Sequence, residues 1–383
     1  MTPQAPETSV GGEIVVATPH VQIVEEELAK LKVVPVGREV SSELGLTLLR
    51  LSPDHVREAA GPPPTSGRLA TADALTRLLD ALYQRFERRY GGWRPTMGKN
   101  RWVGSVHNIT GGGEGAPRRG GGRLHPRESE PGSRVRVGVT DTGLYHHAWY
   151  AGASHCPPAS RLPTDVVPAR YETGHATFVT GLILQEAPGA TVEMRRVLDD
   201  DGRADSWSVA SKLVLLARAE LDVLNLSLGC FTDDNSPPLV LSTALDRMPP
   251  HVVVVAAAGN HGATDPQPQP FWPAALEEVV AVGAVDADGQ RPPWSPDASR
   301  LPWVDVVATG VGVESTYLPA VQGAEGPEDF GETATWSGTS FAAAKVTGVL
   351  AARTVPGVLS AGYVLRDLVK EPPRRWQGVP WLA

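Results

Sequence analysis

The segment Val252-Val-Val-Val-Ala-Ala-Ala-Gly-Asn260 is apolar along its whole length until it reaches Asn260. A continuous apolar run of this kind predicts a strand that belongs to a sheet covered on both faces. Ligands of open parallel sheets bind beyond the carboxyl ends of the strands. We therefore expect Asn260, which follows the strand directly, to lie at the edge of a binding site.

Other apolar runs of the same type occur on both sides of this segment, at residues 135–139, 192–197, 223–228 and 279–285. Helical patterns alternate with them at residues 176–184, 207–219 and 238–248. This alternation predicts an α/β domain over residues 134–383, with a doubly wound, mostly parallel sheet that has helices on both faces.

Three further polar residues are expected at the same edge. Asp141 follows the first apolar run, while His175 and Ser340 each open a helix. A serine hydroxyl needs an adjacent base to act as a nucleophile, and a helix start favours developing negative charge. Aspartate, histidine and serine, with Asn260 as an oxyanion donor, are the minimum set for acyl transfer at a peptide carbonyl.

Each of the four residues also has a plainer interpretation. Ser340 could be only a helix N-cap, and Asp141 only part of an Asp-Thr-Gly turn. His175 could be a buried structural histidine, and Asn260 a residue in left-handed conformation at a strand end. Four such residues, each inside its own local motif, favour the catalytic interpretation.

The local motifs and their order resemble the subtilisin-like serine proteases, over about residues 134–355. The motifs are Val137–Gly143, Gly174–Gly181, Ala258–Asn260 and Gly338–Gly348. The resemblance implies that Ser340 is the nucleophile and His175 the general base. Asp141 would orient His175, and Asn260 would hold the oxyanion together with the backbone N–H of Ser340. The implied function is a serine endopeptidase that works through an acyl-enzyme.

The resemblance also implies a substrate-binding edge within Leu224–Gly229. The residues that would pair with an extended peptide or protein substrate, as in strand addition, are Ser227, Leu228 and Gly229. The residues that would form one wall of the first pocket are Ala257, Ala258 and Gly259. Leu228 would contribute to a more distant apolar pocket.

The chain departs from the family at two positions. Ala176 stands after the histidine, where the family usually has glycine, and Ala344 stands where it usually has proline. Neither change removes a chemical group, so we expect activity. The alternative is a catalytically weak pseudoprotease, or a peptide-binding protein, with a permanently attached regulatory N-terminal domain.

Residues 13–107 predict a small α+β domain. Strands fit residues 13–17, 33–36, 44–51 and 102–106, and helices fit residues 21–31 and 71–90. This βαββαβ order is that of a ferredoxin-like split βαβ sandwich. The domain resembles the propeptide of the family, which implies an intramolecular chaperone and inhibitor. Residues 1–12 are expected to be a disordered tail.

Residues 108–133 lose all periodicity and predict a flexible linker. The stretch from Gly111 to Gly122 holds seven glycines, and Arg118-Arg119 within it is a candidate site for a cut. Residues 85–136 carry 12 Lys or Arg against four Asp or Glu, in a chain of net charge −8. The basic stretch lacks interleaved aromatic residues, so we predict no nucleic-acid partner.

The N-terminal residues lack the pattern of a signal peptide, and no apolar run is long enough to span a membrane. With only Cys156 and Cys230 in the chain, we predict a cytoplasmic protein with reduced thiols and no membrane partner, leaving non-classical export open. No cofactor or metal site is predicted. Asp199–Gly202 lacks the alternating ligands of a calcium loop, although family members often bind structural calcium, and His146-His147 lacks partners at zinc spacing.

Overall fold

The structure is a computed structural model that describes residues 9–106, 115–121, 124, 131–163, 167–168, 170–263, 269–323 and 326–383. Most of the predicted tail at residues 1–12, and residues 108–114, 122–123 and 125–130 of the predicted linker, lie outside the described residues. The chain forms two compact units. The first unit comprises Met1–Trp102, Asp205–Val214 and Thr232–Arg247, and the second comprises Val103–Ala204, Leu215–Phe231 and Met248–Ala383.

The first unit contains an antiparallel sheet in the order β4-β1-β3-β2. Its strands are β1 (Ser9–Ala17), β2 (Pro35–Ser41), β3 (Leu46–Leu51) and β4 (Met97–Ser105), whose last three residues belong to the second unit. Its helices are α1 (Val21–Lys30), α2 (Pro53–Ala60) and α3 (Ala74–Arg89). The α+β prediction is confirmed, with α2 as an unpredicted short helix that buries only Val56.

One face of this sheet carries the core of the first unit. Side chains of a strand alternate between faces, and Ile14 and Val16 of β1 share a cluster with Leu49 and Leu51 of β3. All three helices contribute to the same cluster, through residues such as Leu28, Val56 and Leu82. The helices therefore cover one face of the sheet.

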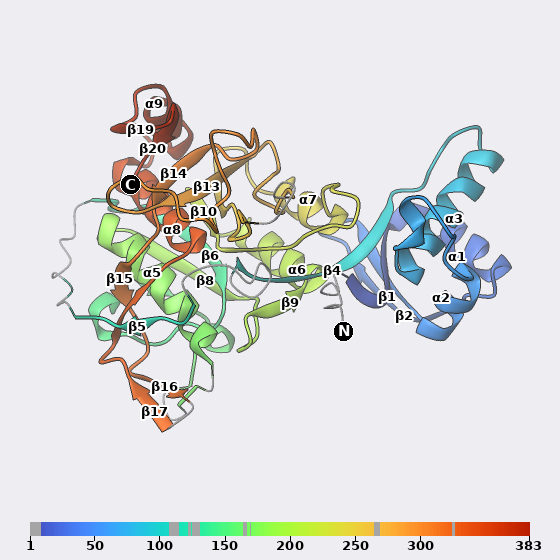
Figure 1. The fold of residues 1–383 in the computed structure, drawn as a ribbon, viewed down its shortest axis with the longest axis horizontal. Helices are drawn as coiled ribbons and strands as arrows, with labels where there is room; N and C mark the ends of the chain where they lie inside the picture. Colours follow the sequence, from blue (N-terminus) through green and yellow to red (C-terminus); the bar gives the residue numbers. More distant parts are fainter. Residues whose placement is uncertain are drawn as a thin grey trace. The chain divides into compact units, whose positions relative to one another are not determined.

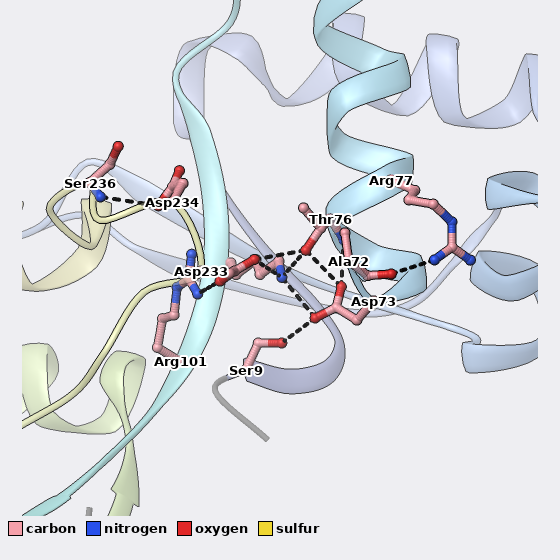
Figure 2. A network of polar contacts seen from close by, with 10 residues as sticks. Ser9, Ala72, Asp73, Thr76, Arg77, Arg101, Asp233, Asp234 and Ser236 are labelled. Carbon is pink, nitrogen blue, oxygen red and sulfur yellow. Dashed lines mark hydrogen bonds and ion pairs between the residues drawn. The ribbon is translucent and has the colours of Figure 1, made fainter. Parts of the chain in front are cut away.

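A polar network ties β4 and α3 to the segment Thr232–Arg247 within the first unit (Figure 2). The Lys99 ammonium lies 2.9 Å from a carboxylate oxygen of Asp73 and 2.8 Å from one of Asp233, and Arg101 also pairs with Asp233. The side chains of Lys99 and Arg101 are only 3% and 8% exposed. Buried charges of this kind require their partners, so residues more than a hundred positions apart depend on one another.

The start of α6 (Ser206–Leu216) is held in the same unit by β4 and β2. The side-chain oxygen of Asn100 accepts hydrogen bonds from the Ser206 hydroxyl (2.7 Å) and the Trp207 backbone N–H (3.0 Å). The Trp207 indole N–H donates to Glu39 at 2.8 Å. Helix α7 (Leu239–Leu245) follows within the segment Thr232–Arg247.

The second unit is built on a nine-stranded sheet in the order β19-β20-β14-β13-β12-β10-β6-β8-β7. The strands are β6 (Arg136–Asp141), β7 (Ser154–His155), β8 (Thr191–Arg196), β10 (Val223–Leu226), β12 (Val253–Ala257), β13 (Val279–Val285), β14 (Val306–Thr309), β19 (Arg374–Trp376) and β20 (Val379–Trp381). Neighbours pair in parallel except at β19 and β20. The predicted α/β fold with a mostly parallel sheet is confirmed.

The strand order reverses beside β6. The chain passes from β6 to β8 on one side of it, and then to β10, β12, β13 and β14 on the other. Connections that leave in opposite directions open a crevice at the carboxyl ends of the strands, where such folds bind ligands. The reversal therefore places the candidate site near the ends of β6 and β10.

Three longer helices belong wholly to the second unit: α5 (His175–Glu186), α8 (Thr339–Arg353) and α9 (Ala361–Lys370). Helices α5 and α8 lie side by side (Figure 1). A Cβ atom at Gly348 would lie 2.6 Å from the Cβ atom of Glu186. The approach of the two helices therefore requires glycine at this position.

Smaller β structures complete the second unit. One small sheet has the order β15-β18-β5, formed by Val313–Thr316, Thr333–Trp336 and Arg118–Arg119. Strands β16 (Ala320–Gly323) and β17 (Gly326–Asp329) form a separate pair. The short strand β9 (Arg203–Asp205) pairs with β4, and β11 (Leu228–Gly229) follows β10. No helix in the described part of the chain is long and apolar enough to cross a membrane.

Candidate active site

Asp141 and His175 form the central pair of the candidate site. Asp141 is the last residue of β6 and His175 is the first residue of α5, and both are buried. Nδ1 of His175 lies 2.9 and 2.8 Å from the two carboxylate oxygens of Asp141. The backbone N–H of Thr142 also donates to Asp141 Oδ1, at 2.7 Å. A carboxylate held in this way favours the histidine tautomer with its proton on Nδ1.

Thr142 connects the end of β6 to the start of α5. Its hydroxyl donates to the carbonyl oxygen of Thr173 and accepts a hydrogen bond from the backbone N–H of Ala176, each at 3.2 Å. A helix start leaves backbone N–H groups without intrahelical partners, and Thr142 satisfies one of them. The threonine thereby fixes the helix start, and with it His175, relative to Asp141.

Aromatic side chains enclose the imidazole of His175. The ring of Trp336 lies edge-on to it, with ring centres 5.8 Å apart, and the ring of Phe341 is tilted at 5.5 Å. Gly174 precedes the histidine, and a Cβ atom there would lie 2.2 Å from the ring of Tyr317. The close approach of Tyr317 explains why position 174 is a glycine. The packing of Trp336 and Phe341 restricts the orientation of the His175 imidazole.

Ser340 is the second residue of α8 and is buried. Its hydroxyl lies 3.5 Å from the carbonyl oxygen of Ser227, while the Ser227 hydroxyl donates to the Ser340 carbonyl at 3.0 Å. The amide of Asn225 donates to the Ser227 hydroxyl at 2.9 Å, and the Asn225 oxygen accepts from Thr347 at 3.0 Å. This chain of buried hydrogen bonds fixes the start of α8 against the end of β10.

The side-chain amide of Asn260 is held through its oxygen atom. Its oxygen accepts hydrogen bonds from the backbone N–H and the hydroxyl of Thr339, both at 3.0 Å. The amide nitrogen, which carries the donor hydrogens, takes no part in these two hydrogen bonds with Thr339. A Cβ atom placed on Gly338 would lie 3.5 Å from this nitrogen, so the amide lies beside the residues that precede Ser340.

Gly259 makes the turn between β12 and Asn260. Its φ of +95° disfavours any residue with a side chain, and a Cβ atom there would lie 2.5 Å from Nδ1 of His261. Burial lowers the pKa of His261, which favours the neutral ring. Ala257 and Ala258 precede the glycine and are fully buried.

The segment predicted as the substrate edge differs in structure from the strand expected there. The expected continuous strand at residues 223–228 is divided into β10 and β11, with Ser227 between them. The reason is that Leu228 and Gly229 turn away from the large sheet and pair antiparallel with Ser105 and Gly104. All four of these residues belong to the second unit.

The predicted site residues thus gather around the carboxyl ends of β6, β10 and β12. The motifs of Asp141 and Ser340 contain Thr142 and Thr339, but they do not show the hydrogen bonds by which these threonines orient the predicted residues. Neither the ring packing of Trp336 against His175 nor the pairing of residues 104–105 has a signal in the sequence. Ala176 and Ala344 are fully buried, and the Ala176 backbone is the partner of Thr142.

The other candidates from the sequence have structural partners. The Asp199 carboxylate accepts from the N–H groups of Asp201 and Arg203 within its turn. His147 accepts from the Trp149 N–H at Nδ1, and its Nε2 is 2.9 Å from the Glu332 carbonyl. Within the described ranges, no three His, Cys, Asp or Glu side chains are grouped as a metal site requires.

Comparisons with known proteins relate part of the chain to one protein family. Residues 132–355 match the profile of the Subtilase family. Subtilisin from Bacillus pumilus is 30% identical over 229 residues, which cover 57% of this chain and 76% of that protein. Subtilisin E from Bacillus subtilis (strain 168) is also 30% identical over 229 residues, but the match covers 55% of its length. The matched part of the chain thus spans about half of that relative.

A likeness to a solved structure extends over almost the whole chain. Fervidolysin from Fervidobacterium pennivorans, described as a keratinolytic enzyme related to subtilisin, has a TM-score of 0.63 and 17% sequence identity. The comparison covers 99% of this chain and 61% of that structure. At this identity the likeness concerns the fold.

Proposed function

The chain belongs to the subtilase family, and from this premise we propose that it is a serine endopeptidase with Ser340 as nucleophile. The observation that carries the proposal is the pairing of His175 Nδ1 with both carboxylate oxygens of Asp141. A buried histidine held in this tautomer presents its other nitrogen as a base. The serine expected to use this base opens the neighbouring helix α8.

The proposed reaction proceeds through an acyl-enzyme. Ser340 Oγ attacks the carbonyl carbon of the scissile peptide bond while His175 Nε2 takes the hydroxyl proton. His175 then gives this proton to the leaving amine, and the C–N bond breaks. Water, activated in turn by His175, hydrolyses the ester on Ser340 and restores the enzyme. Asp141 stabilises the positively charged imidazole throughout.

The proposed oxyanion site consists of the Asn260 side-chain amide and the backbone N–H of Ser340. Thr339 holds the oxygen of Asn260, so the amide is oriented before substrate arrives. Donors that are fixed in advance need no reorganisation in the transition state. The helix start at Ser340 adds a favourable potential for the negative charge.

The proposed substrate is a peptide in extended conformation that pairs with Ser227, Leu228 and Gly229. Ala257, Ala258 and Gly259 are proposed to form one wall of its first pocket. In this structure Leu228 and Gly229 already pair with Ser105 and Gly104. A segment of the chain that occupies the substrate strand supports the proposal that the N-terminal domain acts as an intramolecular inhibitor. Its role as a folding chaperone is a further part of this proposal.

Incubation of the full-length chain with an unfolded protein substrate tests the proposed activity. The wild type should cleave itself, the added protein or both, and Ser340→Ala should cleave neither. Ser299→Ala is the matched control, because Ser299 is exposed and its hydroxyl donates to the Asp297 carboxylate at 2.6 Å. Peptide binding without any cleavage by the wild type would favour the alternative of a peptide-binding pseudoprotease.

A further inference from the structure

Residues 115–120, which the sequence assigns to a flexible linker, are bound to the second unit and are called the docked segment below. Within it, Arg118-Arg119 forms β5 and pairs antiparallel with β18. The backbone N–H of Gly120 donates to the carbonyl oxygen of Thr333 at 3.0 Å, and Pro117 is buried. The docked segment is therefore part of the folded second unit rather than a free tether.

Strand β18 has a different neighbour on each of its edges. On one edge it pairs with β15, where the hydroxyls of Ser315 and Thr316 donate to carbonyl oxygens of α5 at 2.7 and 2.8 Å. On the other edge it pairs with β5. A sheet edge without a neighbour leaves a row of backbone groups unpaired. The docked segment thus completes the pairing of a strand that β15 ties to α5, the helix that begins at His175.

The last residue of β18, Trp336, contacts both the docked segment and the candidate active site. Trp336 is only 4% exposed, and its ring lies edge-on to the His175 imidazole, with ring centres 5.8 Å apart. Its indole N–H donates to the carbonyl oxygen of Gly115 at 2.9 Å. A buried indole N–H requires an acceptor. Because Gly115 supplies this acceptor, the docked segment fixes the direction of the indole beside His175.

Strand β18 also leads into the proposed nucleophile. Ser340 lies four positions after Trp336, and between them the N–H of Gly338 donates to the carbonyl oxygen of Gly310 at 2.8 Å. A displacement of β18 would therefore move Trp336 and change the turn that precedes Ser340. A misplacement of about 1 Å away from the reacting atoms can lower a rate by about 10²-fold.

We propose that the docked segment positions the catalytic residues of this chain, and that it acts through β18 and Trp336. The inference rests on the proposed serine endopeptidase activity. Gly115 and β5 are positioning elements, while His175 and Ser340 act on the substrate. Docking should raise kcat and leave KM unchanged, because the proposed substrate-pairing residues 227–229 do not belong to the β15-β18-β5 sheet.

Two neighbouring glycines provide a matched pair of variants. A Cβ atom at Gly120 would lie 2.6 Å from the hydroxyl oxygen of Thr333 and 3.0 Å from its Cβ atom. A Cβ atom at Gly121 would meet no heavy atom of the described residues within 4 Å. Neither glycine has a positive φ, so alanine is compatible with the backbone at both positions. Gly120→Ala should therefore weaken the pairing of β5 with β18, and Gly121→Ala should not.

The wild type and both glycine variants are compared as full-length chains in two assays. One is steady-state cleavage of a fluorogenic peptide, and the other is the rate at which a fluorophosphonate labels Ser340. We expect Gly120→Ala to lower kcat and the labelling rate by about tenfold with KM unchanged. Gly121→Ala should match the wild type, and circular dichroism should show that all three proteins are folded.

Trp336→Phe is a second variant that decides the question if Gly120→Ala does not fold. It keeps an aromatic ring but removes the indole N–H that bonds Gly115. We expect the labelling rate of Ser340 to fall in this variant as well. A segment that served only the stability of the fold would lower the free energy of unfolding and leave the labelling rate of the folded protein unchanged.

The outcomes separate the positioning role from the activity. Labelling of folded Gly120→Ala at the wild-type rate overturns the positioning role and leaves the endopeptidase in place. Faster labelling of Gly120→Ala also overturns it, because the docked segment would then obstruct the site. A wild type in which Ser340 does not react contradicts the proposed activity, and the inference falls with it.

Discussion

Both carboxylate oxygens of Asp141 face the same nitrogen of His175, at 2.9 and 2.8 Å from Nδ1. The arrangement leaves Nε2 as the nitrogen that can exchange a proton with a nucleophile. Because the pair is buried, water competes little for these hydrogen bonds. Asp141 is thus expected to act by orienting the histidine and by stabilising its charged form.

Asp141→Asn should lower kcat by about 10⁴-fold while changing KM little, because an amide favours the wrong histidine tautomer. Steady-state kinetics on a fluorogenic peptide measure the effect. Asp305→Asn is the matched control, because this carboxylate also accepts a hydrogen bond from a backbone N–H, that of Ala281, at 2.8 Å. Equal loss of activity in both variants would show that Asp141 is only a structural residue.

Asn260→Ala should lower kcat by about 10²- to 10³-fold, because one oxyanion donor is lost. Thr339→Val retains the shape of the threonine but removes the hydroxyl that bonds Asn260 at 3.0 Å. We expect a smaller loss in that variant, since the Thr339 backbone N–H still holds the amide oxygen. An Asn260→Ala variant with unchanged kcat would exclude the side chain as an oxyanion donor.

Trp336→Phe should preserve most of the ring packing against His175 but remove the hydrogen bond to Gly115. We expect a loss of about 1 kcal/mol in the free energy of unfolding, measured by urea denaturation. Trp336→Ala should lose about 3–5 kcal/mol and also kcat. If Trp336→Ala left kcat unchanged in folded protein, the tryptophan would have no role in positioning the histidine.

The ion cluster around Asp233 should stabilise the first unit, to which all of its members belong. Asp233→Asn leaves Arg101, whose side chain is only 8% exposed, without its carboxylate partner, and an unpaired buried charge is destabilising. Urea denaturation should therefore give a lower free energy of unfolding for Asp233→Asn than for the wild type. Equal free energies of unfolding for the two proteins would contradict a stabilising role of this cluster.

The same cluster should resist mild acid. Burial raises the pKa of Asp233, but the charge of Arg101 and hydrogen bonds from Lys99 and Arg101 outweigh it and hold the pKa well below its usual 3.8. A carboxyl group with a lowered folded-state pKa stabilises fully above its unfolded value and loses this contribution as the pH falls toward the folded value. Urea denaturation at pH 5 and pH 7 should therefore show the same difference in the free energy of unfolding between the wild type and Asp233→Asn, and a smaller difference at pH 5 would contradict this assignment.

The sheet of the second unit could be predicted because its strands are continuous apolar runs. The candidate site could be predicted because Asp141, His175, Asn260 and Ser340 each lie in a local motif. Other features depend on pairing between distant segments. Arg118-Arg119 joins β18 through backbone hydrogen bonds within a glycine-rich stretch that has no apolar periodicity.

The two-unit division could not be predicted for the same reason. Residues 205–214 and 232–247 belong to the first unit although they follow the start of the large sheet. They are held there by single polar side chains such as Asn100 and Asp233, whose partners are far away in the sequence. Patterns of apolar residues carry no information on such contacts.

Reaction of the full-length chain with a fluorophosphonate, followed by peptide mapping, tests most directly whether Ser340 is an activated nucleophile. The expected result is one adduct, on Ser340, that is present in the wild type and absent in His175→Ala. No adduct on Ser340 in the wild type, or equal labelling of the two proteins, would contradict the proposed catalytic serine.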